Sequence, residues 1–148
     1  MFTFSKRTDY ALMALDHLAQ GGQGKLVSAK EISEKYSIPG ELLAKVLQTL
    51  SRNGFIDSQP GPSGGYRLAR DSSEISLGSV VRAIEGEHGL CGCMKGEDPD
   101  CDQLECCSVR EPLQLIHKEL FGVLDKHKLS EFESIRRHNR EPENSHIS

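Results

Sequence analysis

Apolar residues recur at helical spacing in three stretches of the first half of the chain, and turns rich in glycine and proline separate them. Three helices are expected, over residues 5–20, about 28–36 and about 39–53. Ser5 suits the N-cap of the first helix. Residues 28–31 (SAKE) match the capping box, in which Ser caps a backbone amide and Glu returns to the Ser amide.

The period of the pattern then changes from helix to strand. Residues 55–59 and 66–69 are typical of two short strands, and the breaker-rich segment 60–65 between them predicts a hairpin. A fourth helix is expected over about 77–85, capped by Ser76.

The second half begins with a segment that has no periodicity, residues 87–108, and a long helix follows over about 108–127. A short helix is expected around 130–137, and the residues after Asn139 are polar. No apolar run approaches the roughly 20 residues that span a bilayer, and the N-terminus lacks the apolar core of a signal peptide. We therefore expect a cytoplasmic protein.

The order helix, short helix, turn, helix and hairpin predicts a winged helix-turn-helix domain in a fold that is mainly α with a small β-hairpin wing. The third helix would enter the DNA major groove, the second would brace it, and the wing would touch the backbone or minor groove. Winged helices also serve as protein-interaction modules, which leaves that alternative open. The positions expected to face DNA are Ser28, Lys30, Pro39 (suited to the first helical position), Gly40, Glu41, Ala44, Lys45, Gln48 and Arg52 on the helices and Gly61, Ser63, Gly64 and Arg67 on the wing, with Arg70 as a further phosphate contact.

Charge is unevenly spread along the 148 residues. The net charge is −4, but residues 1–82 carry 10 Lys and Arg against 8 Asp and Glu, whereas residues 83–148 carry 8 against 14. A polyanionic partner should therefore meet the first half. No nucleophile–base pair, phosphate-binding loop or pair of catalytic carboxylates stands out, so we do not expect an enzyme.

All five cysteines lie within residues 91–107, and an odd, clustered set argues against a secreted disulfide scaffold. Cys93, Cys101 and Cys107 have x7 and x5 spacing, wider than the two-to-four-residue hooks of structural zinc sites. This spacing favours an iron–sulfur cluster held by three thiolates, with a fourth place open to Asp, His, Cys, water or a small molecule. Zinc, a metal-free thiol switch and spare thiols remain alternatives.

These features together resemble the Rrf-type bacterial regulators, the family of IscR, NsrR and RirA. The resemblance covers about residues 2–135. The matching motifs are residues 8–12 (TDYAL), 32–33 (IS), 47–54 (LQTLSRNG), 61–69 (GPSGGYRLA), 75–78 (ISLG) and 81–86 (VRAIEG), followed by the three-cysteine loop and the long helix.

The resemblance implies a homodimer, in which long helices pair, with Cys93, Cys101 and Cys107 as ligands of a [2Fe–2S] or [4Fe–4S] cluster. Asp9 matches the acid that NsrR-type proteins supply from the other subunit as fourth ligand. Alternatives for the fourth place are Cys91 and Cys106. The histidine of IscR-type proteins is replaced here by Arg110.

The implied organisation is a DNA-binding domain (1–86), a cluster-binding loop (87–108), a dimerisation region (109–138) and a flexible tail (139–148). The expected function is a cluster-sensing repressor of genes for iron–sulfur assembly, iron, or nitrosative and oxidative stress. Ala44 and Pro60 replace a base-reading Glu and a basic wing residue of family members, so the operator should differ from that of IscR. A metal-free thiol-redox regulator and a zinc-stabilised interaction module are the alternatives.

Overall fold

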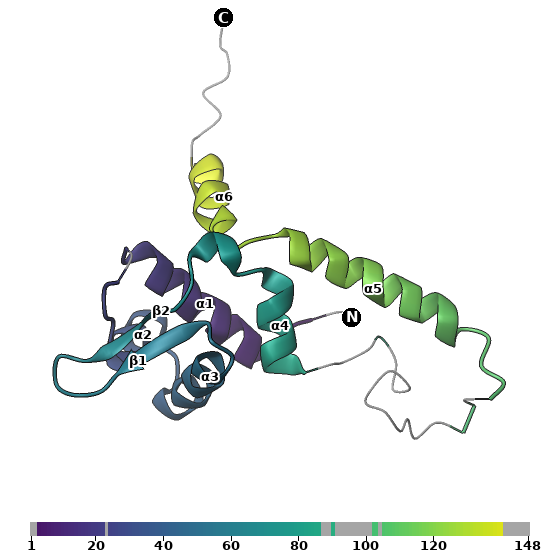
Figure 1. The fold of residues 1–148 in the computed structure, drawn as a ribbon, viewed down its shortest axis with the longest axis horizontal. Coiled ribbons are helices and arrows are strands. Elements are labelled where there is room, and N and C mark those ends of the chain that lie inside the picture. Colours follow the sequence, from purple (N-terminus) through teal and green to yellow (C-terminus); the bar gives the residue numbers. More distant parts are fainter. Residues whose placement is uncertain (1–2, 23, 87–89, 91–101, 104, 141–148) are drawn as a thin grey trace, which may run out of the picture.

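Serine hydroxyls begin three helices in the computed structural model (Figure 1), which describes residues 3–22, 24–86, 90, 102–103 and 105–140. The side chains of Ser5, Ser28 and Ser76 each accept a hydrogen bond from the backbone amide three residues on, as an N-cap does. The helices that they cap are α1 (Lys6–Gln20), α2 (Ala29–Tyr36) and α4 (Leu77–Glu85). The predicted caps of all three are therefore confirmed.

The helix α3 (Gly40–Arg52) is followed by a two-stranded antiparallel hairpin of β1 (Ile56–Gln59) and β2 (Gly65–Leu68). Pro39 lies at the N-cap of α3 with φ −55° and ψ 127°, not at its first helical position as predicted. Gly54 has φ +73°, which lets the chain leave the helix and enter β1 directly. An isolated bridge between Val27 and Tyr66 ties the hairpin to the segment before α2.

One apolar core joins α1, α2, α3, α4 and the hairpin. The inner face of α3 lies in this core, and α1 and α4 pack against that face. The buried apolar side chains of this core are Ala11, Ala14, Leu15, Leu18, Val27, Ile32, Ile38, Leu43, Val46, Leu47, Leu50, Phe55, Ile56, Ile75, Val80, Ile84 and Leu129. The outer face of α3 is thereby held at the surface by a rigid support.

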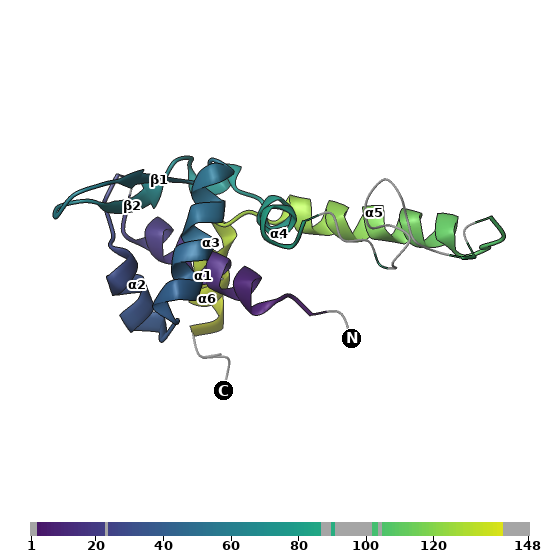
Figure 2. The same cartoon turned by 90° about the horizontal axis from the view of Figure 1, so that it is seen from below.

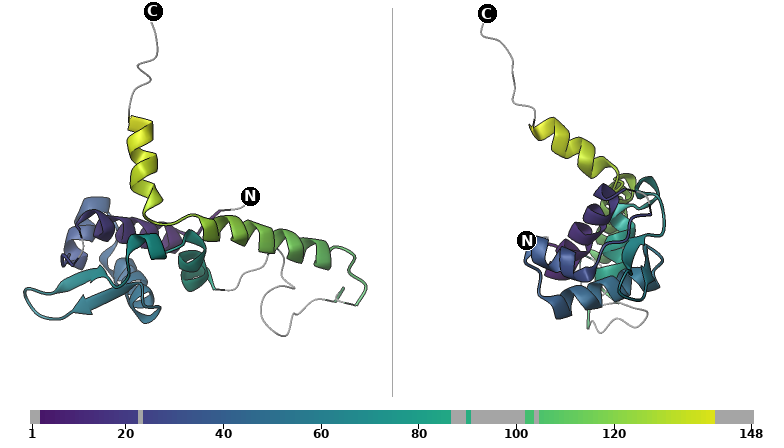
Figure 3. Two further views of the ribbon diagram at one scale, coloured as in Figure 1. Left: turned by 45° about the horizontal axis from the view of Figure 1, so that its top comes forward. Right: turned by 90° about the vertical axis from the view of Figure 1, so that its left-hand side faces the viewer.

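Helix α5 (Arg110–Lys126) extends away from this body and packs mainly on α4 (Figure 2). The hairpin and α5 point toward opposite ends of the molecule. A short 3₁₀ turn, η1 (Ser72–Glu74), precedes α4, and α6 (Glu131–Arg140) projects from the body after α5 (Figure 3). Phe132 of α6 packs against the core, and Arg136 reaches Asp16 of α1.

The predicted fold class is confirmed: the described residues are mainly helical and carry a small hairpin wing. Two helix boundaries differ, since α5 begins at Arg110 and not near Ser108, and α6 ends at Arg140 and not near Arg137. No helix of the described segments is long and apolar enough to cross a membrane.

Candidate nucleic-acid interface

The outer face of α3 carries a row of exposed polar side chains. Leu43, Val46, Leu47 and Leu50 are buried on the inner face. The opposite side of the helix presents Glu41, Lys45, Gln48 and Arg52. Their spacing of four, three and four residues places them in one line along the helix. We call these four side chains the α3 row.

A hollow separates the α3 row from the wing. Small residues on its wall, Ala44 and Ser51, leave room beside the row. The ring of Tyr66 contacts both this hollow and the hydrophobic core, so it fixes the wing against α3. The complete lining is Ala44, Lys45, Gln48, Ser51, Arg52, Ser58 and Tyr66.

The start of α2 and the wing line a second hollow, with Ser28 on one side and Gln59 to Gly61 on the other. The Ser28 hydroxyl accepts from the Glu31 amide at 3.1 Å. Lys30 is 82% exposed in its side chain and lies 3.8 Å from Glu34, a loose ion pair that leaves the ammonium accessible. A hydroxyl and a helix N-terminus thus lie beside the wing, and the exposed ammonium of Lys30 belongs to the first turn of the same helix.

The predicted wing residues lie on the exposed hairpin. Gly61 and Ser63 are exposed at its tip. Gly64 is required by packing, because a Cβ there would lie 1.9 Å from the backbone oxygen of Gln59. Arg67 is exposed and lies 4.0 Å from Asp57 across the hairpin.

Arg70 has a structural role at the end of α3, and its expected contact with phosphate stays a prediction. Its Nε donates to Gly54 O at 3.0 Å and its Nη2 to Asn53 O at 2.9 Å. Its guanidinium also lies over the Phe55 ring, 4.8 Å from the ring centroid. The side chain therefore satisfies carbonyls just past the end of α3.

Only one of the two hydrogen bonds of the predicted capping box at residues 28–31 forms. Ser28 caps Glu31 as expected, but the Glu31 carboxylate turns to His17 of α1, with Oε1 3.2 Å from Nε2. Sequence reasoning missed His17, which is buried at the α1–α2 contact. Local spacing gave no signal for this pairing, since it joins residues that are 14 positions apart.

The predicted cluster ligands lie largely beyond the described segments. Cys91, Cys93 and Cys101 fall outside the described residues. Cys106 is exposed, and its Sγ lies 3.6 Å from Gln103 O, while Cys107 is half-buried.

The remaining candidate ligands lie on helices where the structure describes them. Asp9 is in the first turn of α1, 38% exposed in its side chain and 3.5 Å from Lys6. His117 packs against the Phe121 ring in α5. Where side chains are described, no three His, Cys, Asp or Glu groups come close enough to share a metal ion.

An apolar stripe runs the exposed length of α5. Leu113 is half-buried, and the other members are exposed by 39% to 55%. The stripe follows the alternation of four and three residues that paired helices use at their contact. Its members are Val109, at the cap, and Leu113, Ile116, Leu120 and Val123.

A helix-turn-helix braced on a shared core, with a polar row on its third helix and a wing beside it, defines a winged helix-turn-helix DNA-binding protein. The family model for Rrf2, described as an iron-dependent transcriptional regulator, matches residues 4–133. The chain belongs to the Rrf2 family of DNA-binding transcriptional regulators, which are not enzymes.

Individual relatives agree with this assignment. The HTH-type transcriptional regulator NsrR of Bacillus licheniformis is 32% identical over 124 residues, which are 84% of this chain and 87% of that protein. The structure of T. potens IscR has a TM-score of 0.72 at 23% identity and covers 97% of this chain and 94% of its own, a likeness of fold. The structure of the oxidized form of Staphylococcus aureus CymR has a TM-score of 0.62 at 27% identity. The match covers 86% of this chain and 93% of the CymR chain.

Proposed function

We propose that this Rrf2-family regulator is a homodimeric repressor that senses an iron–sulfur cluster held by its cysteine segment. The observation that carries the proposal is the family match, which spans residues 4–133 and so includes every cysteine of the chain. The identity to a protein named NsrR supports it. The genes proposed as targets serve iron–sulfur assembly, iron, or the response to nitrosative and oxidative stress.

The proposed DNA contact is the α3 row with its flanking hollow. Lys45 and Arg52 would neutralise phosphates or meet guanine, and Gln48 between them suits a bidentate contact to adenine. Ser28 and Lys30 would hold a phosphate at the start of α2, and Gly61, Ser63, Gly64 and Arg67 would follow the backbone along the wing. A regulator that binds such an operator would act in the bacterial cytoplasm.

The proposed dimer contact is the α5 stripe. Val109, Ile116 and Val123 are about half exposed, at 55%, 45% and 52%, and an exposed apolar seam of this length is costly in water. A second copy of the same helix offers a complementary seam, because the four-and-three spacing matches itself in a paired helix.

The proposed cluster ligands are Cys93, Cys101 and Cys107. Asp9 of the partner subunit is the proposed fourth ligand, with Cys91 and Cys106 as alternatives. The donor set fits such a group because thiolates are the ligands that hold iron–sulfur clusters, and the half-exposed Asp9 carboxylate is accessible to a partner. When bound, the cluster supplies iron that reacts with oxygen, peroxide or nitric oxide.

Oxygen-protected purification tests the cluster. We expect a brown protein that contains iron and sulfide, and Mössbauer spectroscopy gives the cluster type. Cys93→Ala should abolish iron binding, whereas Asp9→Ala should retain iron with an altered spectrum. Cys106→Ala is the matched control, since it changes the spectrum only if Cys106 is the fourth ligand. A colourless protein that regulates normally without iron would overturn the proposal.

A metal-free thiol regulator is the second candidate. Exposure of the Cys106 thiol beside Cys107 favours it, together with the likeness to a CymR structure described as an oxidized form. Oxidation would join two thiols in a disulfide as peroxide is reduced to water. Mass spectrometry of iron-free protein after mild peroxide, with DNA affinity measured in parallel, separates this candidate from the first: a disulfide that changes affinity without iron favours the thiol switch.

A further inference from the structure

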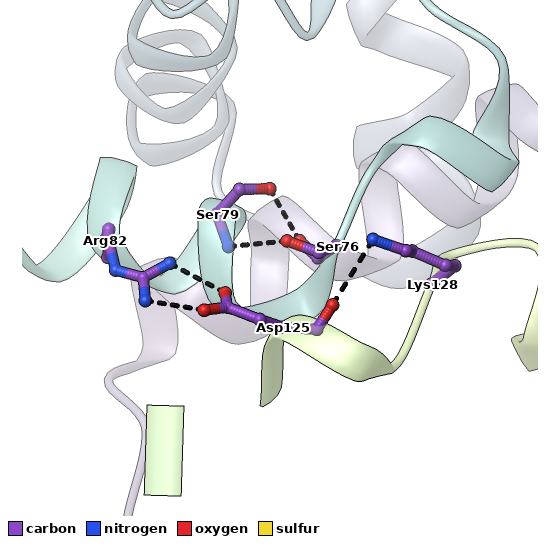
Figure 4. A network of polar contacts seen from close by, with 5 residues as sticks. All are labelled: Ser76, Ser79, Arg82, Asp125 and Lys128. Atoms are coloured by element: carbon purple, nitrogen blue, oxygen red, sulfur yellow. Dashed lines mark hydrogen bonds and ion pairs between the residues drawn. The ribbon is translucent and has the colours of Figure 1, made fainter. Parts of the chain in front are cut away.

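The C-terminal end of α5 is tied to α4 by a dense set of polar contacts, while the rest of α5 extends from the body. Arg82 donates two parallel hydrogen bonds to Asp125, from Nη1 to Oδ1 at 2.7 Å and from Nη2 to Oδ2 at 2.8 Å (Figure 4). The same guanidinium lies over the ring of Phe121, one turn back along α5, 4.7 Å from its centroid. Two bonds and a ring contact fix the orientation of the two helices as well as their separation.

A glycine makes this close approach possible. A Cβ on Gly78 of α4 would lie 2.0 Å from Asp125 Oδ1 and 2.9 Å from its Cγ. Any larger residue at position 78 must therefore displace the Asp125 carboxylate from Arg82. Gly78 faces α5 from the first turn of a helix, where glycine is otherwise a poor choice.

Backbone bonds extend the same contact past the end of α5. The amide of Leu77 donates to His127 O at 2.8 Å, and the amide of Leu129 donates to Ile75 O at 2.9 Å. Lys128 pairs with Ser76, the N-cap of α4, through an isolated bridge. The chain leaving α5 is thus fixed to the chain entering α4.

Helix α4 connects this contact to the DNA-binding helices. Its buried residues Val80 and Ile84 lie in the core that supports α3. Its last residue, Glu85, accepts hydrogen bonds at the start of α1 from the Ser5 amide at 2.9 Å and the Thr8 hydroxyl at 2.5 Å. A rotation of α5 about α4 would therefore move α5 relative to a single rigid unit that includes α3.

We propose that Gly78, Arg82 and Asp125, here called the α4–α5 joint, are positioning residues that set the angle between the dimer helix and the α3 row and thereby select the spacing of operator half-sites. This role rests on the proposed function, because it requires a dimer formed through α5 that binds DNA.

The exposure of the ion pair supports positioning over stability. The side chains of Arg82 and Asp125 are 43% and 42% exposed, and pairs at such exposure contribute little to the free energy of unfolding. A bidentate geometry nevertheless restricts the relative rotation of two helices. Each base pair added between two half-sites rotates one of them by about 34–36° about the DNA axis. A small change in the angle between α5 and the α3 row therefore changes the half-site spacing at which both α3 rows of the dimer can enter the major groove.

The test uses full-length protein and a pool of duplexes in which a random half-site and its inverted copy are separated by spacers of varied length. Arg82→Gln and Gly78→Ala remove the pair in different ways, and Gly78→Ala also favours the helix, so it should fold if Arg82→Gln does not. Arg82→Lys keeps one charge without the bidentate geometry. Glu133→Gln removes a pair within α6, with Arg137, and is the matched control.

We expect wild type and Glu133→Gln to select one narrow range of spacings. In Arg82→Gln and Gly78→Ala, the ratio of affinity for the selected spacings to affinity for other spacings should fall about tenfold. Affinity for a random-sequence duplex should stay the same. Arg82→Lys should be intermediate. Spacing selection unchanged in a dimeric, folded Gly78→Ala variant, or lost equally in Glu133→Gln, overturns the positioning role. Sedimentation of wild type as a monomer, or failure to bind duplex DNA, overturns the proposed function and this role with it.

Discussion

His17 and Glu31 face each other across the junction of α1 and α2, with Nε2 of the imidazole 3.2 Å from the Glu31 carboxylate. On the opposite side of the ring, Nδ1 lies 3.1 Å from the Tyr36 hydroxyl and 3.3 Å from Lys35 Nζ. Because an ammonium only donates, the contacts assign Nδ1 as acceptor and the Nε2–H as donor to Glu31. The His17 side chain of α1 therefore contacts both the first and the last turn of α2.

Replacing Glu31 by Ala should lower the free energy of unfolding by about 0.5–1.5 kcal/mol, because it leaves the buried Nε2–H without this acceptor. Glu34→Ala is the control on the same helix, since its exposed pair with Lys30 should contribute less than about 0.5 kcal/mol. Urea unfolding followed by circular dichroism measures both. Equal midpoints for the two variants would show that the His17 contact does not stabilise α2.

The contact between α4 and the start of α1 gives a second prediction. Thr8 is fully buried, and its hydroxyl donates to Glu85 Oε1 at 2.5 Å. Thr8→Val keeps the shape but removes a donor from a partly buried carboxylate, which should cost about 1.5–3 kcal/mol of unfolding free energy. Thr8→Ser keeps the hydroxyl and should recover most of that loss. A Val variant as stable as the Ser variant in urea unfolding would contradict this role.

Local signals in the sequence were sufficient to predict the helices and the wing. The caps at Ser5, Ser28 and Ser76 involve an amide three residues away, and the apolar period is set within each helix. The partner of Glu31 and the role of Arg70 depend on residues 14 to 17 positions distant, which periodicity does not encode.

The same limit applies to the α4–α5 joint, where Arg82 and Asp125 are separated by 43 positions. Exposure of the α3 row followed from helical spacing, because the apolar inner face fixes the opposite face. The ligand set at Cys93, Cys101 and Cys107 and the domain limits remain predictions.

We expect the free energy of unfolding to depend on pH through Asp125. The hydrogen bond from Arg82 lowers the pKa of Asp125 below its ordinary value of 3.8; burial opposes this, and the charges of Arg82 and Lys128 add to it. The pKa of Asp125 is lower in the folded protein than in the unfolded chain. The stabilisation from its ionised carboxylate is therefore complete at a pH above the unfolded-state pKa, and it is lost as the pH falls through the folded-state pKa.

Asp125→Asn should therefore be less stable than wild type by about 0.5–1 kcal/mol at neutral pH, a modest effect because the side chains of the pair are 43% and 42% exposed. The difference should shrink as the pH falls below about 4. Urea unfolding of both proteins between neutral pH and acid checks this. A difference that grows in acid would contradict the assignment.

The wing turn depends on Gly64. Ala at this position should cost about 1–3 kcal/mol and distort the hairpin, since its Cβ would meet the backbone oxygen of Gln59. Ser63→Ala, one residue earlier and exposed at the tip, should leave stability unchanged. Thermal unfolding distinguishes them, and affinity for duplex DNA should fall much further for Gly64→Ala. Wild-type affinity in both variants would exclude the wing from the DNA contact.

The α3 row predicts how binding responds to salt. If Lys45 meets a phosphate in each half of a symmetric dimer, Lys45→Ala should remove two contacts and reduce the slope of log affinity against log salt by about 1.8. Gln48→Ala should leave this slope unchanged and instead reduce discrimination between a selected duplex and a random one, because an amide reads base edges without releasing counterions.

Lys118→Ala on α5, remote from α3, is the control for a general loss of positive charge and should keep the wild-type slope. Fluorescence anisotropy over a salt series measures all three variants. An unchanged slope for Lys45→Ala would exclude this lysine from the phosphate contact. A slope that falls equally for Lys118→Ala would show that the long-range field of the chain, and not the row, governs the salt response.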